Sequence, residues 1–270
     1  MLIRGGTILK YGFIGVGNMA SAIIKGMVHN GFQANSIFGV NRSQTKLELL
    51  NKEVGLIACP SIEALMQEVD VVVLSVKPQM FEEVLPTVRQ HLREGQIIIS
   101  IAAGKSLDYL HNVLGNNISL FRVMPNMNAT IGASTSCYST RNGSFEMKQI
   151  VENMFKTVGS IVELPEQYYS IFTAVACSSP AFTYMYVDAL ARAAVKAGMP
   201  KQLALEIAAS SVMGSAQMVT ESGTHPWQLI DQVCSPGGTT IEGVTSLQQF
   251  GFEHAVHMAV QAVIEKDLKL

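Results

Sequence analysis

A glycine-rich turn near the start of the chain has the spacing needed to hold a phosphate group. Residues Phe13–Ala20 carry the pattern G-x-G-x-x-A between an apolar run and a segment with helical spacing. Glycine permits the tight turn and a close approach of backbone to pyrophosphate, and the helix N-terminus adds amide groups and positive potential. The pattern predicts a dinucleotide-binding turn, with a purely structural strand-to-helix turn as the alternative. The residues expected at the cofactor here are Gly15, Gly17, Asn18 and Met19.

Basic and polar residues follow the next apolar run, about 20 residues beyond the glycines. An acidic residue at this point would bind the ribose 2′-hydroxyl of NAD, whereas arginine accommodates the 2′-phosphate of NADP. Asn41, Arg42, Ser43 and Lys46 therefore favour NADPH, with NADH still possible. The alternative is a solvated helix cap at Ser43 beside an exposed arginine.

Three further segments follow apolar runs and are expected at the same edge of the sheet. Val76, Lys77 and Pro78 should contact the cofactor mainly through backbone groups, although proline also suits an ordinary helix start. Ala102 and Asn126 follow later runs and are expected near the nicotinamide. Asn126 would either donate to the carboxamide or cap its own turn.

The most unusual segment of the second half is Val233–Glu242, which contains Cys-Ser-Pro-Gly-Gly-Thr-Thr. Proline and paired glycines interrupt two helical stretches and leave free amides and hydroxyls at a new helix N-terminus. Such a loop can hold a small carboxylate. A glycine-rich turn capped by threonine is the alternative.

The elements that must position these residues alternate between apolar and amphipathic segments, which predicts a doubly wound, mostly parallel α/β sheet. The expected strands are Tyr11–Ile14, Ser36–Val40, Val69–Val73, Ile97–Ile101, Ser119–Val123, Ala133–Tyr138 and Ser160–Leu164. The expected helices are Asn18–His29, Gln44–Lys52, Ile62–Gln67, Gln79–Leu92, Leu107–Val113 and Phe145–Val158.

A change of character near Pro165 predicts two domains. Residues 1–164 form an N-terminal Rossmann domain, with 1–9 as a tail, and residues 165–270 form an all-α domain. One helix of the second domain carries mainly small residues on one face, which places that face in a core or a subunit interface. The residues of this helix are Leu203, Ala204, Ile207, Ala208, Ser211, Val212, Ser215, Ala216 and Val219.

The composition indicates which classes of partner the protein can be expected to bind. Charged residues make up 15%, below the roughly 25% of an average chain, which suggests surface hidden in an oligomer. The net charge of -2 is not gathered into blocks, so neither nucleic acid nor a membrane surface is expected as a partner. The richest apolar stretch, Ile171–Ala197, is interrupted by polar and charged residues and should not span a membrane. Four distant cysteines predict no metal site or disulfide and fit a reducing cytoplasm.

The segment from Pro226 onward resembles the diagnostic pattern of the pyrroline-5-carboxylate reductases. The matching residues are Pro226, Leu229, Val233, the run Cys234–Thr240, Gly243, Val244, Leu247 and Gln248. The likeness extends from Lys10 to the end of the chain, with the glycine turn, the Val-Lys-Pro segment, Met124–Asn126 and Ser178–Ala181 in the family's order. Cys177 and Phe182 depart from the Gly and Tyr that the family usually shows.

This resemblance implies a Rossmann domain followed by a helical domain that binds substrate and dimerises, with dimers often forming decamers. It implies reduction of L-1-pyrroline-5-carboxylate to L-proline, the last step of proline biosynthesis. Backbone amides around Gly237, Gly238 and Thr239, with Ser235, would hold the substrate carboxylate, and the Thr240 hydroxyl would contact the ring nitrogen.

Two rival functions stay open on the sequence. A hydroxyacid dehydrogenase of similar architecture would use a lysine within the long helix after the Rossmann domain, but Thr173–Leu190 contains none. An NADP-binding regulatory relative with an altered site is suggested by Cys177 and Phe182.

Overall fold

A computed structural model describes residues 3–4 and 7–269, which divide into two compact units. The first runs to Phe172 and the second from Thr173 to Lys269. The boundary expected after residue 164 coincides with the end of the last strand, whereas the helical turns up to Phe172 still belong to the first unit.

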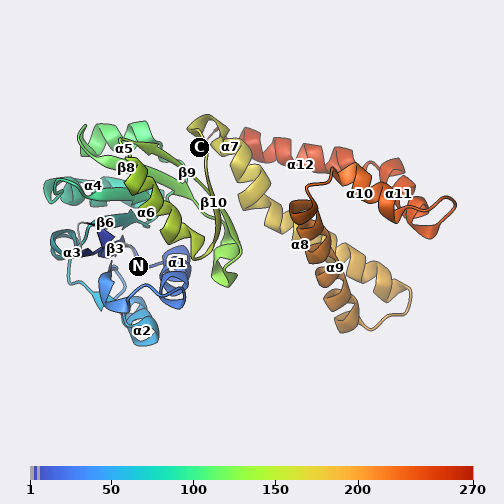
Figure 1. The fold of residues 1–270 in the computed structure, drawn as a ribbon, viewed down its shortest axis with the longest axis horizontal. Helices are drawn as coiled ribbons and strands as arrows, with labels where there is room; N and C mark the ends of the chain where they lie inside the picture. The colour runs from blue at the N-terminus through green and yellow to red at the C-terminus, as the bar shows by residue number, and fades with distance from the viewer. Residues whose placement is uncertain (1–2, 5–6, 270) are drawn as a thin grey trace. The chain divides into compact units, whose positions relative to one another are not determined.

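The first unit is built on a sheet to which eight of the described strands belong (Figure 1). Their order is β10-β9-β8-β7-β6-β3-β4-β5, and all neighbours are parallel except β8 and β9. The strands are β3 (Tyr11–Ile14), β4 (Ile37–Val40), β5 (Ile57–Ala58), β6 (Val71–Leu74), β7 (Ile97–Ser100), β8 (Ser119–Met124), β9 (Ser134–Arg141) and β10 (Gly159–Glu163). The order reverses direction between β3 and β6, which is the point where doubly wound sheets bind ligands.

Helices cover both faces of this sheet, as the fully apolar strands predicted. The helices are α1 (Asn18–His29), α2 (Gln44–Val54), α3 (Ile62–Glu68), α4 (Phe81–Gln90), α5 (Leu107–Leu114) and α6 (Phe145–Lys156). One buried cluster joins residues of α1, α2 and α6 to one face, and a second joins α3, α4 and α5 to the other. The expected doubly wound fold is confirmed.

Short helical turns connect these elements at three places. They are η2 (Pro78–Met80), η3 (Met127–Ile131) and η4 (Glu166–Tyr168), which leads into α7 (Tyr169–Phe172). The sequence did not predict β5, because a two-residue edge strand leaves no periodic pattern to detect.

Within the expected tail of residues 1–9, the short strands β1 (Ile3–Arg4) and β2 (Thr7–Ile8) pair in antiparallel fashion. Residues 1–2 and 5–6 of that tail lie outside the described part of the chain. Leu9 is buried and already belongs to the core of the first unit.

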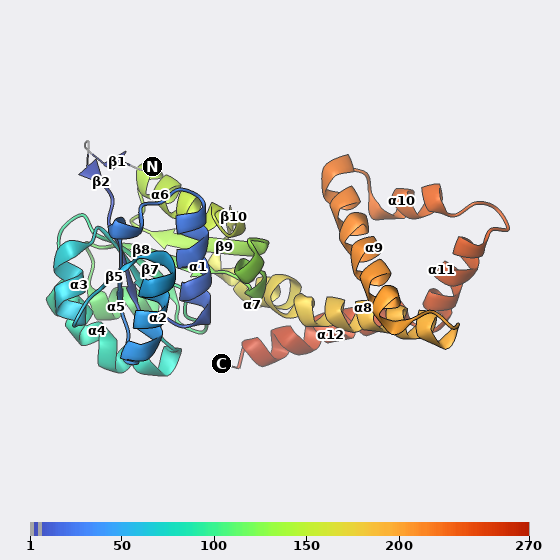
Figure 2. The same ribbon diagram turned by 90° about the horizontal axis from the view of Figure 1, so that it is seen from below.

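The second unit is entirely helical in its described residues (Figure 2). It consists of a π-helix (Thr173–Ser178), α8 (Ser179–Lys196), α9 (Lys201–Ser222), α10 (Pro226–Val233), α11 (Thr239–Gln249) and α12 (Phe252–Asp267). Its buried cluster is only Ala191, Ala204 and Ala208, where α8 meets α9. The predicted small-residue helix is thus partly internal, since these two alanines of α9 pack on α8 while Leu203 and Ile207 stay exposed.

Candidate active site

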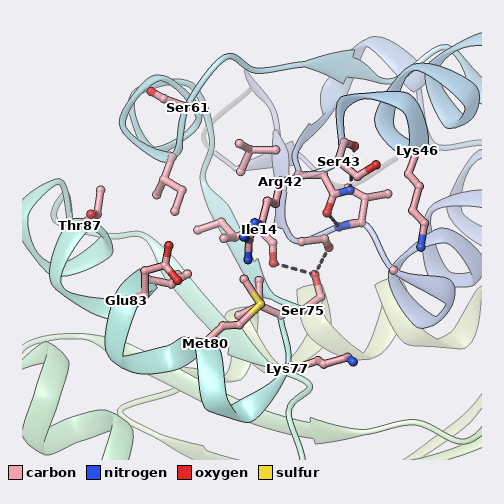
Figure 3. Close-up of a pocket in the computed structure, with 18 of the residues that line it drawn as sticks. Ile14, Arg42, Ser43, Lys46, Ser61, Ser75, Lys77, Met80, Glu83 and Thr87 are labelled. Atoms are coloured by element: carbon pink, nitrogen blue, oxygen red, sulfur yellow. Dashed lines mark hydrogen bonds between the residues drawn. The ribbon is translucent and has the colours of Figure 1, made fainter.

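A pocket of about 1040 Å³ lies at the carboxyl ends of β3, β4 and β6, at the switch point of the sheet (Figure 3). Eight of the thirteen predicted cofactor residues line it. They are Gly15, Gly17, Asn41, Arg42, Ser43, Lys46, Val76 and Lys77. The structure therefore brings together segments that are up to about 60 residues apart in the sequence.

The backbone of the glycine turn explains why glycine is needed at position 15. Gly15 has φ +90°, and an added Cβ would lie 2.7 Å from the Val76 side chain, so both strain and contact exclude a larger residue. A Cβ at Gly17 would meet nothing within 4 Å, which leaves open space beside the turn. No side chain caps α1, so the amides of its first turn face a possible anion without competition.

Side chains from two neighbouring loops hold this turn in place. The Asn41 side-chain oxygen accepts a hydrogen bond from the Val16 amide at 3.1 Å. The Ser75 hydroxyl donates to the carbonyls of Gly15 at 2.6 Å and Ile14 at 3.1 Å. Asn41 thus positions the turn in addition to lining the pocket. Ser75 was missed as a site residue, although a hydroxyl directly after a strand at the switch point was a usable signal.

The pocket is divided by charge. Figure 3 shows Ser43 and Lys46 on one side and Glu83 and Thr87 on the other. In the described part of the chain, neither Arg42 nor Lys46 forms an ion pair. Ser43 precedes α2 without capping it through its side chain, so the helix-cap explanation of this segment is not supported. Two exposed cations beside a phosphate-binding turn suit an additional phosphate.

The remaining five predicted cofactor residues lie outside the lining of this pocket. Met19 packs against the first core cluster. Pro78 is the first residue of η2, and Ala102 is buried after β7. Asn126 is 5% exposed and its side chain accepts a hydrogen bond from the Asn128 amide at 3.1 Å, so it caps η3. The cofactor contacts of these four residues and of Asn18 stay predictions.

The expected substrate residues form one exposed loop in the second unit, between α10 and α11. Ser235 begins its turn, with the Gly238 amide donating to the Ser235 carbonyl at 3.0 Å. Gly238 is the N-cap of α11, and no side chain caps that helix. Thr239 and Thr240 are its first two residues, and Gly237 has φ +69°. The loop therefore presents the uncapped amides and hydroxyls that a carboxylate would require.

The structure gives no indication that Cys177 is a nucleophile. Burial, helped by the negative charge of Asp267, raises the pKa of the Cys177 thiol to about 11, so it is a thiol at neutral pH and a poor nucleophile. Among residues 3–4 and 7–269, no three histidine, cysteine or acidic side chains are grouped to hold a metal ion. Within the same residues, no helix is both long and apolar enough to cross a membrane.

The fold and the pocket define the chain as a nucleotide-dependent oxidoreductase of the Rossmann class. Residues 166–270 match the family model described as pyrroline-5-carboxylate reductase dimerisation. Residues 10–104 match the model described as NADP oxidoreductase coenzyme F420-dependent. The chain belongs to the pyrroline-5-carboxylate reductase family, as the matches to individual proteins also show.

Curated relatives and solved structures agree over nearly the whole chain. The pyrroline-5-carboxylate reductase of Escherichia coli is 39% identical, covering 97% of this chain and 98% of that protein. The Glycine max reductase is 36% identical, covering 96% and 95%. A 1-pyrroline-5-carboxylate reductase structure from Streptococcus pyogenes has a TM-score of 0.84 at 39% identity, covering 97% and 99%. A Plasmodium falciparum pyrroline carboxylate reductase with NADP bound has a TM-score of 0.85 at 30% identity, covering 96% and 97%.

Proposed function

We propose that the chain reduces L-1-pyrroline-5-carboxylate to L-proline with NADPH, the last step of proline biosynthesis. The observation that carries the proposal is the pocket at the switch point, where a glycine turn, an uncapped helix and unpaired Arg42 and Lys46 side chains lie together. Relatives that match this chain over nearly their full length carry the name pyrroline-5-carboxylate reductase, which supports the proposal.

The types of residue that line the pocket suit NADPH. The open space at Gly17 and the amides of α1 would receive the pyrophosphate. Arg42, Ser43 and Lys46 would receive the 2′-phosphate, and NADH would bind without using their charges. When bound, the cofactor supplies the hydride.

The loop at the start of α11 is our candidate for the substrate site. Amides at Gly237, Gly238 and Thr239, with the Ser235 hydroxyl, would bind the substrate carboxylate. The Thr240 hydroxyl, one residue further into the helix, would contact the ring nitrogen. Thr240 is thus the proposed catalytic residue, because it would touch the reacting bond.

The proposed reaction needs little acid–base machinery, which agrees with the side chains present. A cyclic imine that enters protonated is already electrophilic, so hydride can reach its carbon without a side-chain acid that polarises the bond. The carbon gains the hydride and the nitrogen keeps its proton, giving the secondary amine of proline. The protein has only to hold the carboxylate and orient the ring.

The helical unit makes the protein a homo-oligomer through the dimerisation region matched by residues 166–270. We extend this to a homodimer that assembles further into a decamer, working in the cytoplasm. The low charge content and the exposed apolar side chains of the second unit support an extensive subunit contact.

NADPH oxidation followed by absorbance tests the proposal directly. Purified protein is mixed with L-1-pyrroline-5-carboxylate at neutral pH, with 1-piperideine-2-carboxylate and 3-hydroxyisobutyrate as parallel substrates. The 3-hydroxyisobutyrate sample contains NAD in place of NADPH, because a hydroxy acid can only donate hydride. With L-1-pyrroline-5-carboxylate we expect rapid consumption of NADPH and formation of proline. NADPH binding without imine reduction would favour the regulatory rival.

The hydroxyacid dehydrogenase rival predicts the opposite change in the parallel reaction, namely reduction of NAD as 3-hydroxyisobutyrate is oxidised. The structure offers it little support, since Lys196 is the last residue of α8 and no lysine precedes it in that helix.

A further inference from the structure

A largely buried ion pair in the first unit joins β8 to η4, and neither of its residues belongs to the pocket or to the substrate loop. Arg122 on β8 donates to the Glu166 carboxylate of η4, with Nη1 and Oε1 2.6 Å apart. The side chains are only 11% and 26% exposed. Burying two charged side chains costs hydration free energy that a surface ion pair does not lose. Stabilisation by the ion pair alone therefore does not explain why these residues are charged.

Tyr169 of α7 encloses the arginine from another side. Its ring lies under the guanidinium, with the Arg122 Cζ atom 4.3 Å from the ring centroid. The Tyr169 hydroxyl donates to the Arg122 carbonyl at 2.9 Å. Burial raises the pKa of this phenol, so it keeps its proton and remains a donor. The arginine is therefore held through both its side chain and its backbone.

Glu166 also fixes the helix that follows β7. Its two carboxylate oxygens accept from the Leu107 amide, the first residue of α5, at 3.1 and 3.3 Å. The Ser106 hydroxyl caps the same helix by accepting from the Tyr109 amide at 3.1 Å. A negative charge at a helix N-terminus is favourable, so Glu166 is shared between Arg122 and α5.

The two anchored segments are neighbours at the carboxyl edge of the sheet. Arg122 pairs in register with Ser100, the last residue of β7, and Ser100 accepts from the Ala102 amide at 3.4 Å. β8 ends at Met124, two residues after Arg122, and the loop that follows begins with Pro125 and Asn126. These loops end the β6-β7-β8 half of the sheet, whereas the pocket lies at β3, β4 and β6. In a doubly wound fold each half receives one nucleotide of a dinucleotide.

We infer that Arg122 and Glu166 are positioning residues for the nicotinamide end of the cofactor site. Resting on the proposed function, this assigns the pair the task of holding the loops after β7 and β8 in register with each other. Apolar side chains could fill the same space at little cost in stability, but they could not cap α5 and bind β8 together. The buried Nε of Arg122 has no hydrogen-bond partner in the described residues. This unfavourable burial is consistent with an arginine whose role is to position the two segments.

Binding of whole and half cofactor separates this role from simple stabilisation. The probes are NADPH and adenosine 2′,5′-bisphosphate, which carries only the adenine half, titrated into wild-type protein and Arg122→Met. We expect a dissociation constant for NADPH raised at least fivefold and kcat lowered at least tenfold. The constant for the bisphosphate should stay within twofold. Glu152→Gln, which removes the charge of a carboxylate that accepts from the Tyr138 hydroxyl elsewhere in the unit, should change neither.

Glu166→Gln provides the second variant in case Arg122→Met does not fold, since glutamine keeps a side-chain oxygen for the Leu107 amide. The same split between whole and half cofactor is expected, at smaller size. Unchanged NADPH binding and kcat in a folded variant, or equal losses for both probes, would overturn the inference. Failure of wild-type protein to bind either probe would instead remove the proposed function.

Discussion

The two units of the chain differ in how completely they bury their apolar residues. The first has two clusters of fully buried aliphatic and aromatic side chains, one on each face of its sheet. Among the described residues of the second, the buried hydrophobic side chains are five alanines, three of which form its buried cluster, while residues such as Met213 and Ile207 remain 69% and 50% exposed. An isolated helical domain of this kind lacks the burial that offsets chain entropy. The first unit is complete in itself, and the second depends on another subunit.

The exposed side chains of α9 indicate which face of the helix forms a subunit interface. Gln202 and Gln217 donate to Glu206 and Glu221, four residues later, along a polar stripe. Leu203, Ile207 and Met218 follow a neighbouring apolar stripe that has no such bonds. We expect the apolar stripe to be covered in the oligomer and the polar one to remain in water.

Ile207→Asp should have the largest effect, because a two-fold contact would contain the change twice. An unpaired carboxylate buried at the interface costs roughly 3–5 kcal/mol, so the dimer constant should weaken by at least about a hundredfold per substitution. Light scattering after size exclusion measures the mass. Gln202→Glu, which adds the same charge to the polar stripe, is the control and should leave the oligomer intact.

The Ile207→Asp variant also tests whether the first unit folds and binds its ligand without an intact oligomer. Because its pocket is lined entirely by residues up to Thr87, adenosine 2′,5′-bisphosphate should bind Ile207→Asp about as tightly as wild type. Calorimetry measures the affinity. Loss of this binding together with the oligomer would show that the first unit is not complete in itself.

Phe155→Ala tests the contribution of the buried core of the first unit to stability. The side chain is fully buried, and removing it should lower the free energy of unfolding of the first unit by about 3–5 kcal/mol. Denaturant unfolding with a spectroscopic probe measures this loss. Phe145→Ala on the same helix, 75% exposed, is the matched control and should change stability by less than about 0.5 kcal/mol.

Arg42→Ala should change cofactor preference without changing assembly. A charge-assisted hydrogen bond contributes roughly 1.5–3 kcal/mol, so KM for NADPH should rise about 10- to 100-fold while KM for NADH stays within about twofold. Steady-state kinetics with both cofactors measure the ratio. Lys52→Ala, in the last turn of α2, is the control and should leave both constants unchanged. Equal effects on the two cofactors would remove the 2′-phosphate assignment.

Thr240→Ala should have the smallest effect among these changes. We expect kcat to fall about fivefold without disappearing, because a neutral hydrogen bond of about 1 kcal/mol orients an imine that already carries its proton. Thr245→Ala is the control, since that hydroxyl bonds within α11 to the carbonyls of Ile241 and Glu242. Complete loss of activity in folded Thr240→Ala would mean that the hydroxyl donates an essential proton.

Much of the first unit could be predicted because its local signals agree with its tertiary structure. The α1 helix was expected at the bounds observed, since a glycine turn marks its start and apolar spacing marks its length. Strand ends were less certain, as β6 shows by beginning at Val71 instead of Val69. Hydrogen bonding to a neighbour decides where a strand stops, and the sequence of the strand does not contain that neighbour.

The residues of the candidate site also fall into those with a local sequence signal and those without one. The types of Gly15, Gly17 and Arg42 indicated a phosphate site because their chemistry and spacing are themselves the signal. Ser75 gave only the weaker signal of a hydroxyl directly after a strand, and the Arg122–Glu166 pair gave none. Ser75 lies 60 residues from the carbonyl of Gly15 to which it donates, and Glu166 is 44 residues from Arg122.

The sequence by itself determined the alternation of elements, the cofactor class and the family, because periodicity and motif spacing are local properties of the chain. Only the tertiary structure decided that Ser75 and Asn41 fasten the glycine turn, that Asn126 caps η3, and that α9 presents alanine to its neighbour and isoleucine to the outside. These outcomes depend on which distant residue lies opposite each side chain, and burial and hydrogen bonding across the fold set that pairing.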